Sequence, residues 1–346
     1  MGCTTNPLLA LSTRCLGGLA CIAMVLLSPG CTVWQKGAIA PGVVVEGVHT
    51  GAEALDFDPS SSLLASGGWD GRVAVWHPNE SKPLHVWQAH DGWIQGIVFL
   101  DGRILTGGFD GQIRVWRTNG EAVGGVDARS PITRMIAHGE HLVTGHQDGY
   151  VRFWDLTSLR LLSETDAHSE AISALAGDPR AARVASSALD GDVYLISASG
   201  TKTLAMRPSR VVSSLSFDLD GGTLYGGTWF DIVRWDVNAS GQTTALGDVR
   251  TPHWGNIIGL QYLSSESGLA TISRTNDSSV LFLNPDTGAI IQHFERQAIC
   301  GGAVKVSQDG RLMATTGDDG VVRIWDFNAQ ISISAALSND TPETFP

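Results

Sequence analysis

Residues 63–76 read LLASGGWDGRVAVW, and this pattern sets the architecture of the whole chain. Two short apolar runs, 63–66 and 72–76, are separated by turn residues. An Asp-Gly pair at 70–71 between two such runs is typical of a β-hairpin, because glycine adopts a positive φ without a clash at Cβ. The segment therefore predicts two adjacent antiparallel strands.

The same pattern recurs seven times, at intervals of about forty residues. The aligned segments are GRVAVWH (71–77), GQIRVWR (111–117), GYVRFWD (149–155), GDVYLIS (191–197), FDIVRWD (230–236), SSVLFLN (278–284) and GVVRIWD (320–326). The position that is usually tryptophan holds Trp76, Trp116, Trp154, Ile196, Trp235, Leu283 and Trp325. An Asp stands six residues earlier in six units: Asp70, Asp110, Asp148, Asp190, Asp277 and Asp319. A fixed period of this length predicts a repeat architecture of stacked units.

This register resembles the WD40 repeat, and the resemblance covers residues 41–337. The Trp-Asp pair stands at 154–155, 235–236 and 325–326. The resemblance implies an all-β fold, a seven-bladed β-propeller of four-stranded WD40-like blades. Four strands per unit around an axis agree with the short runs and the turn residues of each unit.

The family also implies a buried network in each blade, in which a histidine, a hydroxyl, the Asp and the Trp hydrogen-bond to one another. Units one and two carry all four members: His49, Ser66, Asp70 and Trp76, then His90, Thr106, Asp110 and Trp116. Unit four has His168, Ser186 and Asp190 but Ile196 in place of Trp. His253 stands in the corresponding loop of unit six.

Closure of the propeller requires one strand from elsewhere in the chain. Residues 42–46 precede His49 much as residues 84–87 precede His90. We therefore expect residues 42–46 to form the outermost strand of the last blade. Residues 331–334 (ISIS) compete for the same edge, and the sequence leaves that alternative open.

Residues 1–30 have the layout of a secretory signal peptide. They contain no Asp or Glu, and Arg14 precedes the apolar run CLGGLACIAMVLL, residues 15–27. A charge, a run of this length and a small-residue exit are typical of such a peptide, whereas a membrane-spanning helix needs about 20 apolar residues. We expect residues 31–40 to be a linker and residues 338–346 a disordered tail.

The end of the apolar run resembles a bacterial lipoprotein processing site, in which a small residue precedes the cysteine that becomes lipidated. Gly30 and Cys31 fit that junction, although Ser28 stands where such sites usually carry Leu. Lipidation at Cys31 would anchor the protein at the cell envelope facing the periplasm; secretion in soluble form is the alternative. Cys300 would then be a buried free thiol.

Composition and motifs argue against several classes of function. A formal net charge of -12 makes nucleic acid an unsuitable partner. The chain contains neither a phosphate-binding glycine loop nor a Gly-x-Ser-x-Gly nucleophile motif. His138, His141 and His146 look like a metal cluster, but His146 lies five residues along an extended strand from His141, about 16 Å away. We therefore expect no metal, no cofactor and no catalytic residue.

Five aromatic residues stand at loop positions of the expected propeller. They are Trp69, Trp93, Phe109, Trp229 and Trp254. Turns prefer Gly, Asn, Asp and Pro, whereas Trp is among the residues that anchor protein interfaces. We interpret the five as a protein-binding surface; the alternative is that they fold over the axis and plug the channel.

These features favour a non-catalytic protein-interaction scaffold, exported and lipid-anchored at a bacterial cell envelope. We expect a monomeric propeller within a larger complex. One alternative is an assembly-factor subunit of a membrane-protein machine in the same envelope. Another is a small-ligand receptor or enzyme that uses the propeller channel.

Lipidation can be tested by replacing Cys31. The substitution Cys31→Ala should leave an unprocessed precursor and abolish membrane association of the mature form, because no thiol remains to carry the lipid. Cell fractionation and mass spectrometry of the N-terminus measure both. An unmodified N-terminus downstream of Cys31 in the parent protein would contradict lipidation but not export.

Overall fold

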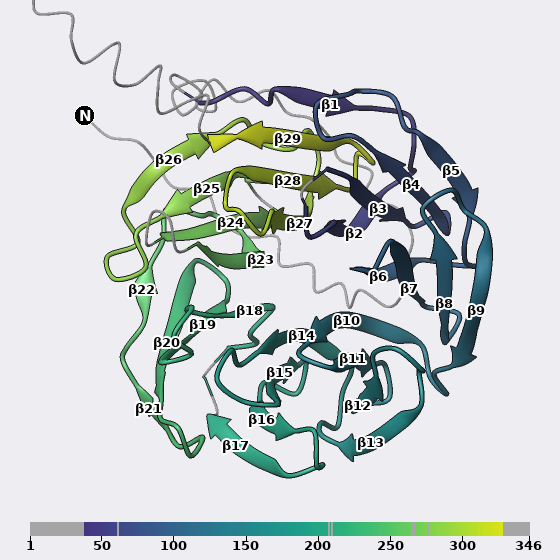
Figure 1. Ribbon diagram of the computed structural model, residues 1–346. Coiled ribbons are helices and arrows are strands. Elements are labelled where there is room, and N and C mark those ends of the chain that lie inside the picture. The colour runs from purple at the N-terminus through teal and green to yellow at the C-terminus, as the bar shows by residue number, and fades with distance from the viewer. Residues whose placement is uncertain are drawn as a thin grey trace, which may run out of the picture. The chain divides into compact units, whose positions relative to one another are not determined.

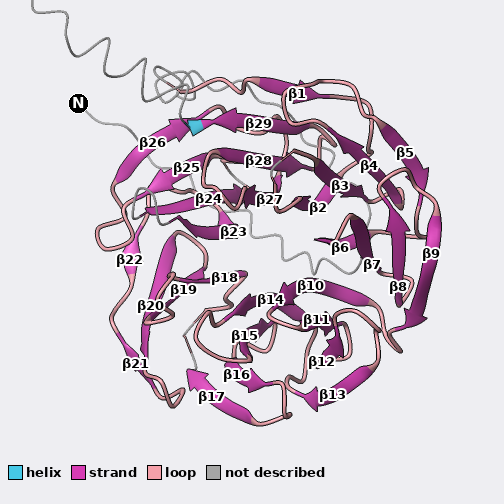
Figure 2. Ribbon diagram, in the orientation of Figure 1, coloured by secondary structure: helices cyan, strands magenta, loops and turns pink. Residues whose placement is uncertain are grey.

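The computed structural model describes residues 38–60, 62–206, 208, 210–263, 268–275 and 277–327, and it folds them into seven antiparallel sheets around one axis (Figure 1). Nearly all of the regular structure is strand (Figure 2). The prediction of an all-β, seven-bladed propeller is confirmed. In the first six blades the strands follow the chain from the axis outward, whereas the outermost strand of the seventh comes from the N-terminal side of the described residues.

The blades are numbered from the N-terminal side, and their strands have the following bounds. Blade 1 contains β2 (Ala52–Phe57), β3 (Leu64–Gly68), β4 (Arg72–Trp76) and β5 (His85–Gln88); blade 2 contains β6 (Ile94–Leu100), β7 (Arg103–Gly108), β8 (Gln112–Arg117) and β9 (Ala122–Asp127). Blade 3 contains β10 (Ile132–His138), β11 (His141–His146), β12 (Tyr150–Asp155) and β13 (Leu161–Asp166); blade 4 contains β14 (Ile172–Gly177), β15 (Arg183–Ala188), β16 (Val193–Ser197) and β17 (Lys202–Met206). Blade 5 contains β18 (Ser214–Phe217), β19 (Thr223–Gly227), β20 (Asp231–Val237) and β21 (Thr243–Ala245), with β22 (Val249–Arg250) also paired to β20. Blade 6 contains β23 (Asn256–Leu263), β24 (Gly268–Arg274), β25 (Val280–Leu283) and β26 (Ile290–Phe294); blade 7 contains β27 (Gly301–Val306), β28 (Leu312–Gly317), β29 (Val322–Asp326) and β1 (Val43–Val45).

The core lies between neighbouring blades, and the Trp-position residue fills it. Trp76 of blade 1 packs in one cluster with Val322 and Ile324 of blade 7, and Trp154 of blade 3 packs with Val98 and other residues of blade 2. The same holds where the tryptophan is replaced, since Ile196 of blade 4 packs against blade 3 and Leu283 of blade 6 against blade 5. Each blade therefore buries its aliphatic face against the blade before it.

The hairpin between the second and third strands has the turn chemistry that the Asp-Gly pairs predict. Gly71, Gly111, Gly149, Gly191 and Gly320 all have positive φ. At Gly71 an added Cβ would lie 2.0 Å from the carbonyl oxygen of His90, which belongs to the next blade. Glycine is required there both by the backbone conformation and by the approach of the neighbouring loop.

The N-terminal strand closes the propeller, as expected. Val43 to Val45 pair with Ile324 to Val322 of β29, so β1 is the outermost strand of blade 7. Ile39 forms a parallel bridge to Phe294 of blade 6, and its carbonyl accepts a 3.0 Å hydrogen bond from Trp325 Nε1. The segment therefore joins the last two blades at their outer side.

Several expectations fall outside the described residues. They are the signal peptide (1–30), Cys31, the competing strand 331–334 and the tail 338–346. Within the described part of the chain, no helix combines the length and apolar character needed to cross a membrane. Cys300 is a free thiol, but the expectation of burial was wrong: it is half-buried, because it lies in the loop that leads into β27.

Removal of residues 38–47 should destabilise the whole propeller. The deletion exposes the edge of β29 and leaves the buried Trp325 N–H without its acceptor, which together should cost about 3 kcal/mol or more. At about 2 °C per kcal/mol the melting temperature should fall by about 6 °C or more, as measured by thermal denaturation. A deletion that melts like the parent, with the loss appearing instead after removal of residues 330–337, would assign closure to the C-terminal strand.

Candidate functional site: the loop face

Two sets of loops emerge at one end of the propeller and form what we call the loop face. One set leads into the innermost strand of each blade, and the other joins its second and third strands. A repeated backbone hydrogen bond joins the two sets: Trp69 to Gly51 (2.9 Å), Phe109 to Trp93 (2.8 Å), Gln147 to Pro131 (3.0 Å), Leu189 to Ala171 (3.3 Å) and Asp318 to Cys300 (2.8 Å), amide to carbonyl. The residue before the hairpin Asp is therefore fixed at the surface of this face.

Three of the predicted aromatic residues form a continuous cluster, which we call the aromatic stack. The Trp69 and Trp93 rings are stacked with centroids 5.3 Å apart, and the Trp93 and Phe109 rings lie 6.2 Å apart. Trp93 is 38% exposed and Phe109 is 41% exposed. The stack bridges blades 1 and 2 and leaves much of its apolar surface open to a partner.

Trp69 is the inner member of the aromatic stack. It packs closely on Gly51, where any Cβ would lie 2.6 Å from the indole, and the Arg274 guanidinium lies 5.9 Å from its ring centroid. Its Nε1 is buried without a hydrogen-bond partner among the described residues. Trp69 therefore supports the stack from below, while Trp93 and Phe109 present it.

Trp229 and Trp254 form a second exposed site, at the boundary of blades 5 and 6. Trp229 is 38% exposed and pairs through its backbone with Asn256, and its ring contacts Phe230 edge-on at 5.8 Å. Trp254 is 69% exposed, and Asp277 accepts a 2.7 Å hydrogen bond from its backbone amide. The structure thus divides the five predicted aromatics into two groups on the same face.

Sequence reasoning missed two apolar residues of this face. Leu189 is 59% exposed and Ile299 is 47% exposed. Leu189 stands immediately before the hairpin Asp of blade 4, the same position as Trp69 and Phe109, so the alignment could have found it. Ile299 lies in the loop that leads into β27, the counterpart of the loop that carries Trp93, and no sequence signal distinguishes it from an ordinary loop residue.

The predicted hydrogen-bond network is complete in blade 2. His90 Nε2 lies 2.7 Å from Thr106 Oγ1, and His90 Nδ1 lies 2.8 Å from Asp110. Trp116 Nε1 donates to Thr106 Oγ1 at 3.0 Å. In blade 4, where Ile196 replaces Trp, the structure joins His168 to Ser186 at 2.9 Å and to Asp190 at 3.1 Å.

Blade 1 has the same four residue types, but its network is incomplete. His49 Nε2 lies 2.6 Å from Ser66 Oγ, whereas His49 Nδ1 is 3.6 Å from Asp70 and Trp76 Nε1 has no partner among the described residues. The expectation that all four members hydrogen-bond was wrong here. Threonine is the acceptor in both blades in which this Trp bond forms, although in blade 7 Trp325 donates to the Ile39 carbonyl and not to Thr315.

Two other blades use substitutes that the sequence alignment did not reveal. In blade 3, His146 on β11 bonds Thr144 at 2.7 Å and takes the place of the loop histidine. In blade 6, His253 bonds Thr271 at 2.8 Å rather than the aligned Ser273, which bonds Asp277 instead. His146 lies two residues from Thr144 along β11, and Thr271 lies two residues from Ser273 along β24, so each pair is on the same side of its sheet.

Burial lowers the pKa of two of these histidines, so that they serve as neutral hydrogen-bonding groups inside the blades. It lowers the pKa of His49 to about 4, even though the Asp70 carboxylate acts in the opposite direction. Burial likewise lowers the pKa of His146 to about 4, with a smaller contribution from Arg152. Both side chains are therefore neutral near pH 7, as donors and acceptors inside the blade require.

The hairpin carboxylates are held by arginines of their own blades. The pairs are Asp70–Arg72 (2.6 Å), Asp110–Arg114 (2.6 Å), Asp148–Arg152 (3.1 Å) and Asp319–Arg323 (3.0 Å). Burial raises the pKa of Asp110, but hydrogen bonds from Arg114 and His90 outweigh it and the pKa lies below its ordinary value. These groups therefore stay charged and fix the loops that carry the aromatic residues.

The three histidines considered as a metal cluster are separated by the fold. His138 hydrogen-bonds the carbonyl of Ala181 at 2.7 Å, and His146 belongs to the network at the other end of β11. Across the described residues, no group of three or more His, Cys, Asp or Glu side chains is placed to hold a metal ion.

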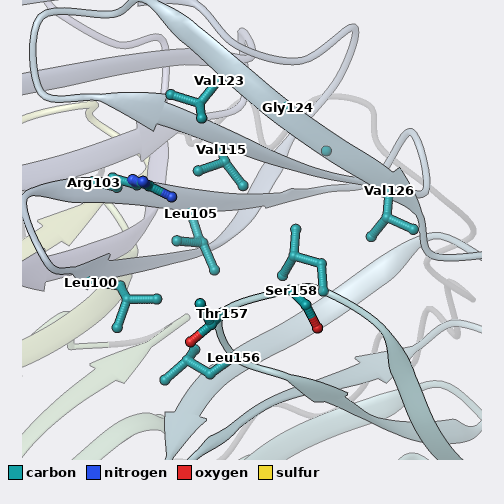
Figure 3. Close-up of a pocket in the computed structure, with 12 residues that line it drawn as sticks. Leu100, Arg103, Leu105, Val115, Val123, Gly124, Val126, Leu156, Thr157 and Ser158 are labelled. Atoms are coloured by element: carbon teal, nitrogen blue, oxygen red, sulfur yellow. The ribbon is translucent and has the colours of Figure 1, made fainter.

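A hollow lies between blades 2 and 3, toward the end of the propeller opposite the loop face. Its volume is about 310 Å³, and Figure 3 shows Leu105, Val115 and Val126 lining it together with Leu156. Thr157 and Ser158 place hydroxyls at its edge. The lining is mainly aliphatic, without a convergent set of charged groups.

Comparison with known families identifies the repeats. The family model for the WD domain, G-beta repeat, matches residues 46–77, 81–117, 127–155 and 292–326. These four segments match the WD40 repeat. Each ends just after a tryptophan that packs between blades, and the three blades without a match carry Ile196, Leu283 or, in blade 5, Trp229 in place of the Asp. The match is therefore confined to segments that keep the tryptophan and the Asp of the pattern.

Several known proteins of eukaryotes are similar to this chain. The chain is 26% identical over 167 residues to angio-associated migratory cell protein of Homo sapiens, covering 46% of this chain and 38% of that protein. It is 23% identical over 331 residues to transducin beta-like protein 3 of Bos taurus (85% and 39%), and 28% identical over 139 residues to eukaryotic translation initiation factor 3 subunit I of Phaeosphaeria nodorum (35% and 42%). The chain thus spans about two fifths of the length of these relatives.

A matched pair of substitutions tests the network. Trp154 is 2% exposed and donates to Thr144 at 2.8 Å, whereas Trp76 is fully buried and its N–H has no partner among the residues that the structure describes. Both Trp154→Phe and Trp76→Phe lose ring volume, but only the first loses a hydrogen bond. Trp154→Phe should therefore reduce the free energy of unfolding by about 1 kcal/mol more than Trp76→Phe, measured by chemical denaturation. Equal losses would show that the indole N–H contributes nothing.

Proposed function

We propose that this chain is a non-catalytic scaffold that binds a protein partner through its loop face, and that it is exported and lipid-anchored at a bacterial cell envelope. The observation that carries the proposal is the concentration of exposed aromatic rings on that face. Trp93, Phe109, Trp229 and Trp254 are each at least 38% exposed there.

The fold does not require aromatic rings at these loop positions. A propeller is stabilised between its blades, and loop-face turns are satisfied by Gly, Asp and backbone hydrogen bonds. A tryptophan that is 69% exposed, as Trp254 is, buries little surface in the free protein. Trp residues anchor interfaces because they bury a large apolar area and lose little side-chain entropy.

A scaffold role also fits the chemistry and the relatives. The repeated His and Asp side chains, which could otherwise serve as acids or bases, are engaged within their own blades. One relative is, by its name, a subunit of a translation initiation factor, and therefore part of an assembly. We propose a corresponding role here as a monomeric propeller within a larger complex, with a different partner.

The envelope location rests on the N-terminal sequence. Arg14, the apolar run 15–27 and the Gly30-Cys31 junction have the order of a lipoprotein signal. A lipid on Cys31 would leave a short segment before β1, which begins at Val43. The anchored protein would present the propeller to partners at the membrane surface.

Substitutions on the loop face should weaken partner binding with little loss of stability. The partner is first identified by crosslinking and affinity purification from the membrane fraction. Trp254→Ala and Trp93→Ala should then each reduce affinity about 30-fold or more, as loss of 2 kcal/mol at an anchor residue implies. Trp254→Ala should leave the melting temperature nearly unchanged, whereas Trp93→Ala should lower stability by about 1 kcal/mol, because it contacts two neighbouring rings.

The matched control is Leu219→Ala. Leu219 is 60% exposed and lies in the turn between β18 and β19, at the opposite end of the propeller. This variant should bind the partner like the parent. Equal loss of binding in all three variants, or a large loss of stability with binding intact, would exclude the loop face as the interface.

A further inference from the structure

The innermost strands of all seven blades line a channel along the propeller axis. The cavity within it has a volume of about 210 Å³. Figure 1 shows β2, β6, β10, β14, β18, β23 and β27 facing the centre. Its charged lining residues are Glu53, Arg134 and Arg274.

Arg274 is neutralised by two carboxylates. Its Nη1 lies 2.7 Å from Glu53 and its Nη2 lies 2.6 Å from Asp318. Burial lowers the pKa of Arg274, but the two carboxylates outweigh this and raise it above its ordinary value. Both terminal nitrogens of the Arg274 guanidinium are therefore already paired, and so is the Glu53 carboxylate.

Arg134 has no such partner. Among the described residues no carboxylate lies within 4.0 Å of its guanidinium. Only its Nη1 donates hydrogen bonds, to the carbonyl of Thr133 at 2.6 Å and, more weakly, to Gln95 Oε1 at 3.4 Å. Its Nε and Nη2 make no hydrogen bond to any described residue and can therefore donate to a ligand. The pKa of Arg134 is lowered, mainly by burial. The Glu53 carboxylate acts to raise this pKa, and the positive charge of Arg274 acts to lower it.

Arg134 also departs from the repeat. The innermost strand contains a β-bulge in most blades, and the residue after the bulge is Ala54, Gly96, Ala174 or Gly259 in four of the others. In blade 3 the bulge falls at Thr133 and the next residue is Arg134. A long, half-buried cation thus stands where four other blades carry only Ala or Gly.

Two further donors line the same cavity. The Gln95 amide nitrogen donates to no group among the described residues, and its oxygen already faces Arg134. The Ser213 hydroxyl accepts a 2.9 Å hydrogen bond from Asn256, which leaves its own proton free to donate. Arg134 offers a planar fork of N–H groups, which suits the paired oxygens of a carboxylate or a phosphate.

We propose that the channel binds a small oxyanion, a carboxylate or phosphate group held by the guanidinium fork of Arg134 with Gln95 and Ser213 as additional donors. The nearby Glu53 carboxylate, although paired with Arg274, favours a group of low charge over a polyanion. This site is independent of the aromatic residues of the loop face.

The test titrates the full-length protein with sodium phosphate and, separately, with sodium acetate, using sodium chloride at equal ionic strength as the reference. Isothermal titration calorimetry should show saturable binding of one anion per chain for at least one of the two, and the tighter one identifies the oxyanion class. The bound anion should also raise the melting temperature, because it binds only the folded state. Arg134→Gln should reduce the affinity at least tenfold.

Matched variants separate the site from general charge. Arg117→Gln removes an exposed arginine paired with Glu121 at the other end of the propeller and should bind the anion like the parent. If Arg134→Gln fails to fold, Arg134→Lys, which keeps the charge but not the fork, and Ser213→Ala should each weaken binding several-fold. Trp254→Ala should retain full anion binding, so failure of the protein-binding proposal is a separate result. Absence of saturable binding to the parent, or equal binding by the Arg134 and Arg117 variants, would overturn the proposal.

Discussion

The packing of one blade against the next is the constraint on which the structure depends. A single four-stranded sheet of this chain exposes two faces and cannot bury both alone. Stacking around an axis buries them in turn, and a large residue from the third strand fills each interface: Trp76 is fully buried against blade 7 and Trp325 is fully buried against blade 6. Such stacking leaves no free end only if the first and last blades meet, which is why β1 must complete blade 7.

Sequence alone was sufficient for the blade count, the hairpins and the closing strand, because each rests on periodicity or on local turn chemistry. It was insufficient for the hydrogen bonds inside the blades. Ser66 bonds His49 while Trp76 has no acceptor among the described residues, and His146 can replace a loop histidine because it lies on the same side of β11 as Thr144. These are matters of distance across a sheet, and a residue pattern along one strand does not encode them.

The core between the blades supplies most of the stability, so a binding surface can arise on the loops. The paired carboxylates and the repeated amide-to-carbonyl bonds hold the loop face in place, so its side chains contribute little to stability. The loop position before the hairpin Asp accordingly holds very different residues, Trp69, Phe109, Gln147 and Leu189 among them. Sequence analysis located five of the aromatic residues because Trp is unusual in turns, but it could not show that three stack together, since Trp69 and Trp93 come from different blades.

Contacts between blades close the propeller both at its outer rim and at its axis. At the rim, β1 and Ile39 join blades 7 and 6; at the axis, the Arg274 fork of blade 6 reaches Glu53 of blade 1 and Asp318 of blade 7. Both devices act on the blades where the chain closes on itself, which is where a propeller has no covalent continuity to rely on. Because the aliphatic core lies between blades and not on the axis, the channel can carry charged side chains without disrupting packing. Charge at the axis is therefore compatible with the fold, and only its pairing differs from one position to the next.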